Sequence, residues 1–156
     1  MEKQEFTRIL LDMTDTLYRI SAAQLPQKAD REDAVQETLR KAWEKRKTLR
    51  EERYMKTWVI RILLNECHSM QRKMARTLPA ETVPARQPDR EESPLKDALL
   101  QLEERYRTPI LLHYLEGYSV AETANILRVP QGTVKTWLAR GRKTLKEILN
   151  EEVFEG

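Results

Sequence analysis

The sequence has little of several features on which other classes of protein depend. It contains a single cysteine in 156 residues, so an internal disulfide is excluded and a reducing compartment is expected. Four glycines and an aromatic content of 6% are a poor composition for turn-rich sheet proteins and favour helices. No apolar run is long enough to span a bilayer, and the polar N-terminus is unlike a signal peptide. These absences predict a soluble, cytoplasmic protein without direct membrane insertion.

Catalytic and metal-binding patterns are also missing. The two histidines, His68 and His113, lie far apart and have no cysteine or histidine at ligand spacing, so we expect no metal. Glu103 and Glu104 stand beside no pattern of nucleophile and base. Cys67 falls on the apolar face of a predicted helix, where a cysteine usually packs as a small hydrophobic residue. We therefore expect no enzyme, no cofactor and no small-molecule substrate.

Charge is what the chain has in abundance. Charged residues make up 34% of the sequence, yet 28 basic residues are nearly balanced by 25 acidic ones, for a net charge of +3. Any affinity for nucleic acid must therefore come from the local placement of the cations. The length fits one or two small domains.

Residues 118–148 have the pattern of a helix-turn-helix. Ser119 and Glu122 have the S-x-x-E spacing of a capping box, which begins a helix. Pro130 cannot continue that helix but can open the next one. The second helix has one apolar face, formed by Val134, Leu138, Gly141, Leu145 and Ile148. Two short helices joined in this way are typical of proteins that read DNA.

The opposite face of the second helix carries charge of one sign. It has no acid before Glu147, whereas a solvated helix usually mixes both signs. Such a face suits phosphates and base edges, although a merely cationic surface helix would also show it.

Two residues depart from the usual helix-turn-helix pattern. Arg128 stands in the turn where glycine is common, which requires either a left-handed residue or an altered turn. Gly141 costs roughly 1 kcal/mol relative to alanine inside a helix. We expect its face to pack very closely against a neighbour.

The segment PQGTVKT at 130–136, followed by Arg140 and Arg142-Lys143, resembles the recognition helix in region 4 of extracytoplasmic function (ECF) sigma factors of bacterial RNA polymerase. The resemblance implies contact with the −35 promoter element. The residues implied for this contact are Thr133, Lys135, Thr136, Ala139, Arg140, Arg142 and Lys143. Thr136, Ala139 and Arg140 are expected to reach base edges, and Lys135, Arg142 and Lys143 to meet phosphates.

A second segment, REDAVQET at 31–38 followed by Trp43, resembles region 2.2 of the same family. In the family this helix grips a coiled coil in the polymerase clamp. The resemblance implies polymerase contacts at Asp33, Gln36, Glu37 and Arg40. We expect a helix from Asp30 whose buried face contains Val35, Leu39, Ala42 and Trp43. From composition alone, the same charges could simply match the helix dipole.

A third segment, TWVIRILLN at 57–65, is similar to family regions 2.3 and 2.4, which melt and read the −10 element. The residues implied for this contact are Tyr54, Met55, Lys56, Arg61, Asn65, Arg72 and Lys73. The first three are expected in a loop that receives a flipped base, because a pocket and a basic groove can offset the cost of unstacking. HSMQ at 68–71 departs from the family's more basic continuation.

The remaining segments are predicted from apolar periodicity and proline content. One N-terminal helix should end before Pro26, with a stripe of Phe6, Ile9, Leu10, Met13, Leu17 and Ile20. Residues 78–94 contain four prolines and no apolar periodicity, which predicts a flexible linker. Beyond it, Thr108-Pro109 should begin a new helix, with Leu111, Leu112 and Leu115 buried against the helix-turn-helix.

The sequence thus predicts an all-α protein with two small helical domains joined by a flexible linker, the second containing the helix-turn-helix. Residues 1–77 would bind polymerase and melt the −10 element, and residues 95–156 would recognise the −35 element. The resemblance implies core RNA polymerase, promoter DNA and an anti-sigma factor as partners. Two alternatives stay open: a free-standing, dimeric helix-turn-helix transcriptional regulator, and an anti-sigma-like scaffold that binds only helices, without DNA binding that depends on Arg140.

Overall fold

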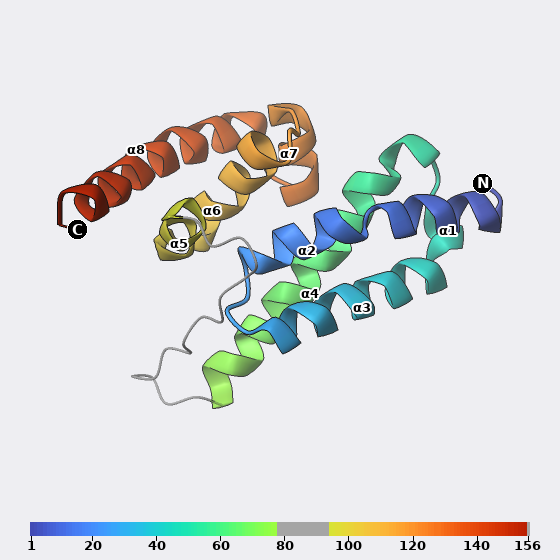
Figure 1. Ribbon diagram of the computed structural model, residues 1–156. Coiled ribbons are helices and arrows are strands. Elements are labelled where there is room, and N and C mark those ends of the chain that lie inside the picture. The colour runs from blue at the N-terminus through green and yellow to red at the C-terminus, as the bar shows by residue number, and fades with distance from the viewer. Residues whose placement is uncertain (78–93, 156) are drawn as a thin grey trace. The chain divides into compact units, whose positions relative to one another are not determined.

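The structure is a computed structural model that describes residues 1–77 and 94–155, with 151–155 described by their backbone alone. The chain divides into two compact units, Met1–Gln87 and Pro88–Gly156. Every regular element in the described ranges is helical (Figure 1), which confirms the predicted all-α class. The predicted linker at 78–94 lies outside the described residues, except that Pro94 is the first residue of a helix, a position that proline tolerates well.

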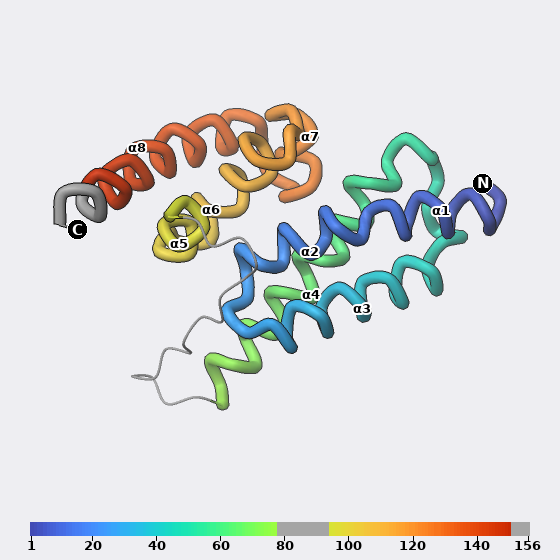
Figure 2. Tube along the Cα trace, viewed as in Figure 1, coloured from blue at the N-terminus to red at the C-terminus, as the bar shows by residue number. Residues whose placement is uncertain are grey.

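Within residues 1–77, the first unit contains four α-helices. They are α1 (Lys3–Asp12), α2 (Thr14–Ala22), α3 (Lys28–Glu44) and α4 (Met55–Thr77), with short 3-10 turns at Arg46–Thr48 and Glu52–Tyr54 between α3 and α4. The helices α2, α3 and α4 pack against one another, and α1 runs nearly in line with α2 (Figure 2).

The prediction of one N-terminal helix is wrong, because the chain is interrupted at Met13. The Met13 N–H is shared between the carbonyls of Ile9 and Leu10, both at 3.2 Å. The Thr14 hydroxyl donates to the Leu11 carbonyl at 2.8 Å, and such bonds compete with the helical ladder. The stripe nevertheless stays buried at Phe6, Leu10, Met13, Leu17 and Ile20, whereas Ile9 is half-buried.

The predicted buried face of α3 is right at Val35 and Ala42 and wrong at Trp43. Trp43 is 37% exposed, because it lies at the rim of the core. Its ring meets Phe6 at a centroid distance of 6.2 Å on one side. The Arg46 guanidinium covers it at 4.1 Å, a stacking arrangement that tolerates partial exposure.

Arg31 is a core residue that the sequence did not reveal, with only 3% exposure. Its guanidinium donates to the carbonyls of Leu25 and Pro26, each at 2.8 Å. Gln71 donates to the carbonyl of Gln24 at 2.9 Å. These bonds satisfy the loop carbonyls that follow α2. The structure therefore explains Gln71, which lies in the segment that departs from the family's basic continuation.

The second unit surrounds one long helix. It consists of α5 (Pro94–Gln101), α6 (Glu104–Ile110), a π-helical turn η3 (Leu111–Leu115), α7 (Val120–Leu127) and α8 (Gln131–Glu155). Helix α8 packs against α5, α6 and α7. The buried core cluster contains Leu99, Leu102, Ile110, Ala124, Val134 and Leu138.

The prediction that Thr108-Pro109 begins a helix is wrong, because Pro109 lies inside α6. Proline has no N–H, so the helical ladder loses a bond here. The chain then widens into the π turn, in which the Glu116 N–H bonds to the Leu111 carbonyl at 3.0 Å. The wider turn rotates the residues that follow. Leu115 is consequently 45% exposed and not buried as predicted.

Candidate nucleic-acid interface

The helix-turn-helix begins with the predicted capping box. The Ser119 hydroxyl accepts from the Glu122 N–H, and the Glu122 carboxylate accepts from the Ser119 N–H, each at 3.0 Å. Gly117, with φ of +80°, separates α7 from the preceding turn. The start of α7 is therefore fixed by local contacts, as the sequence predicted.

Arg128 resolves the question about the turn, because it adopts the left-handed conformation with φ 57° and ψ 47°. The next N–H, that of Val129, bonds back to the Ala124 carbonyl at 3.1 Å. The turn therefore keeps its usual geometry, and Arg128 adopts a strained backbone conformation. For a residue with a Cβ, this strain is about 1–2 kcal/mol.

The two faces of α8 follow the predicted division. Val134 and Leu138 are buried, and Leu145 and Ile148 pack partly buried against the same core. Gly141 is buried as well. On the other side, the exposed residues are Lys135, Thr136, Ala139, Arg140, Arg142 and Lys143, with Thr133 half-buried.

The exposed residues of α8 form a central stripe and a flank. Thr136, Ala139, Arg140 and Lys143 are spaced i, i+3, i+4 and i+7, so they share one stripe. Lys135 and Arg142, seven residues apart, lie together beside it. A helix lying in a groove would therefore present the middle of the stripe, at Thr136, Ala139 and Arg140, to the bases. The two ends of the stripe and the flank would then lie nearer the strand backbones.

The cations on this face are not neutralised by the protein. In the parts of the chain that the structure describes, no carboxylate pairs with Lys135, Arg140 or Lys143. The Arg142 guanidinium lies 5.7 Å from the centre of the Tyr114 ring, a contact that leaves its charge intact. This face can therefore bind phosphates without first breaking internal ion pairs.

Gly141 is required by packing, as the sequence predicted. A Cβ at this position would lie 2.5 Å from Cδ1 of Ile110 and 3.3 Å from Cβ of Tyr106. Helix α8 can therefore approach α6 closely only where it carries no side chain.

In the first unit, part of the predicted −10 set forms a stripe along α4. Arg61, Asn65 and Arg72 are spaced i, i+4 and i+11 and share one face, and Lys73 lies beside it. Asn65, Arg72 and Lys73 are exposed and Arg61 is half-buried. Lys56, nine residues before Asn65, lies on the opposite side of the helix.

The prediction that Met55 and Lys56 lie in a loop is wrong. Helix α4 begins at Met55, and the Met55 side chain is 1% exposed, so it belongs to the core. Tyr54 precedes the helix and is 45% exposed, with the Arg53 guanidinium 4.8 Å from its ring centre. The sequence could not separate Met55 from its neighbours because burial here depends on packing against distant residues.

The predicted polymerase contacts share one face of α3, because Asp33, Gln36, Glu37 and Arg40 are spaced i, i+3, i+4 and i+7. Arg40 pairs with Glu37 and with Glu44. The hydrogen bond from Arg40 holds the pKa of Glu37 below its ordinary value. The same bonds raise the pKa of the Arg40 guanidinium. On this face, the charges of Glu37 and Arg40 are therefore paired with each other.

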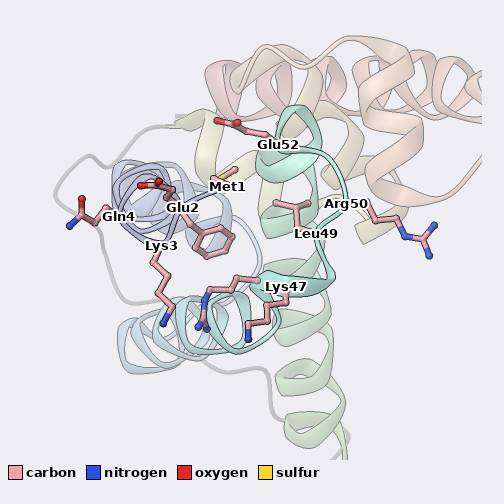
Figure 3. A pocket seen from close by; sticks show the side chains of 10 residues that line it. Met1, Glu2, Lys3, Gln4, Lys47, Leu49, Arg50 and Glu52 are labelled. Carbon is pink, nitrogen blue, oxygen red and sulfur yellow. The ribbon is translucent and has the colours of Figure 1, made fainter.

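A pocket between the N-terminus of α1 and the loop before α4 was not predicted (Figure 3). Its volume is about 750 Å³, and its lining includes Lys3, Lys47, Arg50 and the acids Glu2 and Glu52. No sequence pattern indicates this pocket, because its walls come from segments that are distant along the chain. Its mixed charge suits an anionic strand less well than the face of α8 does.

The second unit contains a helix-turn-helix whose exposed face is cationic, and the same chain contains another helical unit. This combination is that of an all-helical, DNA-binding transcription factor. Comparison with known proteins identifies the family. The family model for sigma-70 region 2 matches residues 11–77, and that for sigma-70 region 4 matches residues 93–145.

Individual relatives and a solved structure agree with these matches. RNA polymerase sigma factor SigV of Bacillus subtilis (strain 168) is 30% identical over 97% of this chain and 98% of its own length. ECF RNA polymerase sigma factor SigM of Mycobacterium tuberculosis is 30% identical over 85% of this chain and 71% of its own. The sigma factor RpoE from Bartonella quintana, solved in complex with the anti-sigma factor NepR, has a TM-score of 0.81 and 29% identity, covering 94% of this chain and 98% of that one.

The chain belongs to the ECF sigma factors of RNA polymerase. As a sigma factor, it directs core polymerase to promoter DNA and initiates transcription, and the free-standing regulator is not favoured. Within residues 1–77 and 94–155, no helix combines the length and apolar character needed to cross a membrane.

Proposed function

We propose that the two units divide promoter recognition between them. Residues 1–77 bind core polymerase and open the −10 element, and residues 95–156 read the −35 element. The matches to sigma-70 regions 2 and 4 support this division. The observation that carries it is the unpaired cationic face of α8, since promoter DNA is a polyanion that a major-groove helix can read.

At the −35 element, the central stripe of α8 would supply the base contacts. Thr136, Ala139 and Arg140 would reach base edges. Among the described residues, no carboxylate pairs with Arg140, whereas Arg40 on α3 pairs with Glu37. Lys135, Arg142 and Lys143 would hold the helix on phosphates, helped by Thr133. Phosphate contacts set position and base contacts set specificity.

At the −10 element, the stripe of Arg61, Asn65 and Arg72 on α4 would follow the separated strand, with Lys73 beside it. Tyr54 would stack on an unpaired base, because its exposed ring precedes the helix. Lys56, on the other side of α4, would contact a different segment of the strand. Met55 is left out of this set because it is buried.

Polymerase would be bound by the face of α3 that carries Asp33, Gln36, Glu37 and Arg40. The chain would act in the cytoplasm with the polymerase and would itself catalyse no reaction. Because the similar RpoE from Bartonella quintana is solved with the anti-sigma factor NepR, we propose that a protein of the same class restrains this chain.

The test is run-off transcription with bacterial core polymerase and this protein, on genomic fragments of the source organism, with the RNA 5′ ends mapped. New starts that share two spaced upstream motifs, absent with core alone, would support the division of labour. An Arg140→Ala variant should reduce transcription from these starts, with wild-type affinity for core. If starts appear but share only the −10 motif, the role of α8 is refuted.

A further inference from the structure

Helix α8 contains two glycines, Gly132 and Gly141, and only one of them is explained by the protein itself. A glycine inside a helix costs about 0.5–1 kcal/mol relative to alanine. At Gly141 this cost is offset by the close contact with Ile110, which a Cβ would approach to 2.5 Å.

At Gly132, no close contact within the protein requires a glycine. Apart from its two chain neighbours and the backbone of its own helix, no heavy atom of the described residues lies within 4 Å of the point where its Cβ would stand. Its φ is not positive, so any residue could adopt its backbone conformation. Its carbonyl accepts the Thr136 hydroxyl at 3.1 Å, which any residue would allow. Packing within the described residues therefore does not explain why position 132 is a glycine.

The position of Gly132 indicates what it could serve. It lies four residues before Thr136 and seven before Ala139, on the central stripe of the cationic face. It is exposed and lies in the first turn of α8. Thr133 and Val134 direct their N–H groups to the Pro130 carbonyl. The N–H groups that begin the turn are those that a helix offers to an external acceptor.

We propose that Gly132 sets how deeply α8 enters the DNA groove, by letting a sugar–phosphate segment of one strand lie directly against the first turn of the helix. A strand backbone is the fitting partner, because Gly132 has no side chain to read a base, lies one turn before Lys135, which has no carboxylate partner in the described residues, and stands beside the free N–H groups of the first turn. This role rests on the proposed −35 function of α8. Gly132 is a positioning residue, so its effect is independent of base sequence.

The experiment compares Gly132→Ala and Gly132→Gln with a matched control, Asn150→Ala. Asn150 is exposed on the same stripe, eighteen residues or five turns after Gly132. Full-length variants are measured by thermal unfolding, and by binding of the reconstituted holoenzyme to a promoter fragment from the run-off assay and to the same fragment with a scrambled −35 element.

Gly132→Ala should raise the unfolding midpoint by about 1–4 °C, through helix propensity. The same change should weaken binding roughly tenfold, by the same factor on both fragments. Gly132→Gln should weaken binding further without unfolding the protein, and Asn150→Ala should bind as the wild type does. A protein that is more stable but binds DNA less well is a result that a purely structural role cannot give.

Arg140→Ala separates the two ways in which the proposal could fail. If Arg140→Ala weakens promoter binding while Gly132→Ala and Gly132→Gln bind as the wild type, the role of Gly132 is overturned and the −35 face stands. If none of the three changes affects binding, the −35 role of α8 itself falls. A loss confined to the intact −35 fragment would overturn the sugar–phosphate contact in favour of a base contact.

Discussion

The cations of α3 and α8 differ in whether the protein already pairs them. On α3, Arg40 is held by Glu37 and Glu44, and Lys41 pairs with Glu66 of α4. On α8, within the described residues, Lys135 and Lys143 have no carboxylate partner. An unpaired face gains Coulomb energy from any polyanion, whereas a paired face must exchange its partners and so favours one complementary surface.

Replacement of the unpaired Arg140 should have the largest effect. Arg140→Ala should cost about 1–3 kcal/mol of promoter binding and relax preference at one base pair. Competition binding of the holoenzyme with promoters that carry single base changes in the −35 element measures both quantities. A uniform loss on every sequence would instead make Arg140 a phosphate contact.

Arg40→Ala tests the face of α3, on which Arg40 is paired with carboxylates. Because Arg40 is exposed and screened by water, loss of its ion pairs should barely change the unfolding midpoint. Affinity for core polymerase should fall roughly tenfold, and binding of core by size-exclusion or anisotropy titration measures it. An unchanged affinity would remove Arg40 from the polymerase contact.

A smaller effect is expected from Lys143→Ala. Since Lys143 is proposed to meet a phosphate, promoter affinity should fall by a similar factor on every sequence. The slope of log affinity against log salt should decrease by about 1. Salt titrations of wild type and variant provide the measurement, and an unchanged slope would contradict a phosphate contact.

The smallest effect concerns pH. The hydrogen bond from Arg40 lowers the pKa of Glu37 in the folded protein. Its contribution to stability is therefore present above the unfolded-state pKa and is lost as pH falls through the lowered value. Unfolding midpoints across the acid range should decline slightly less steeply for Glu37→Gln than for the wild type. A steeper decline for the variant would reverse the sign of this contribution.

The sequence predicted best those features that local contacts determine. The capping box of Ser119 and Glu122 depends on residues three apart, and both of its bonds are present. The faces of α8 follow from periodicity, and the close packing of Gly141 follows from its cost inside a helix.

Features that depend on contacts between distant segments were missed. The burial of Arg31 depends on loop carbonyls that need a donor, and the burial of Met55 on packing around the start of α4. Pro109 looked like a helix start, but the chain tolerates it within α6 by widening the next turn. The roles of individual residues toward DNA and polymerase stay predictions, since they depend on partners that the sequence only implies.

The left-handed Arg128 makes one position of the helix-turn-helix unusually selective toward substitution. In a library of all amino acids at this position, glycine and asparagine should be the best tolerated, because they enter this conformation at least cost. Valine and isoleucine should be the worst, since a branched Cβ resists it most strongly. Which substitutions are tolerated at position 128 would thus depend on backbone geometry and hardly at all on the charge of the side chain.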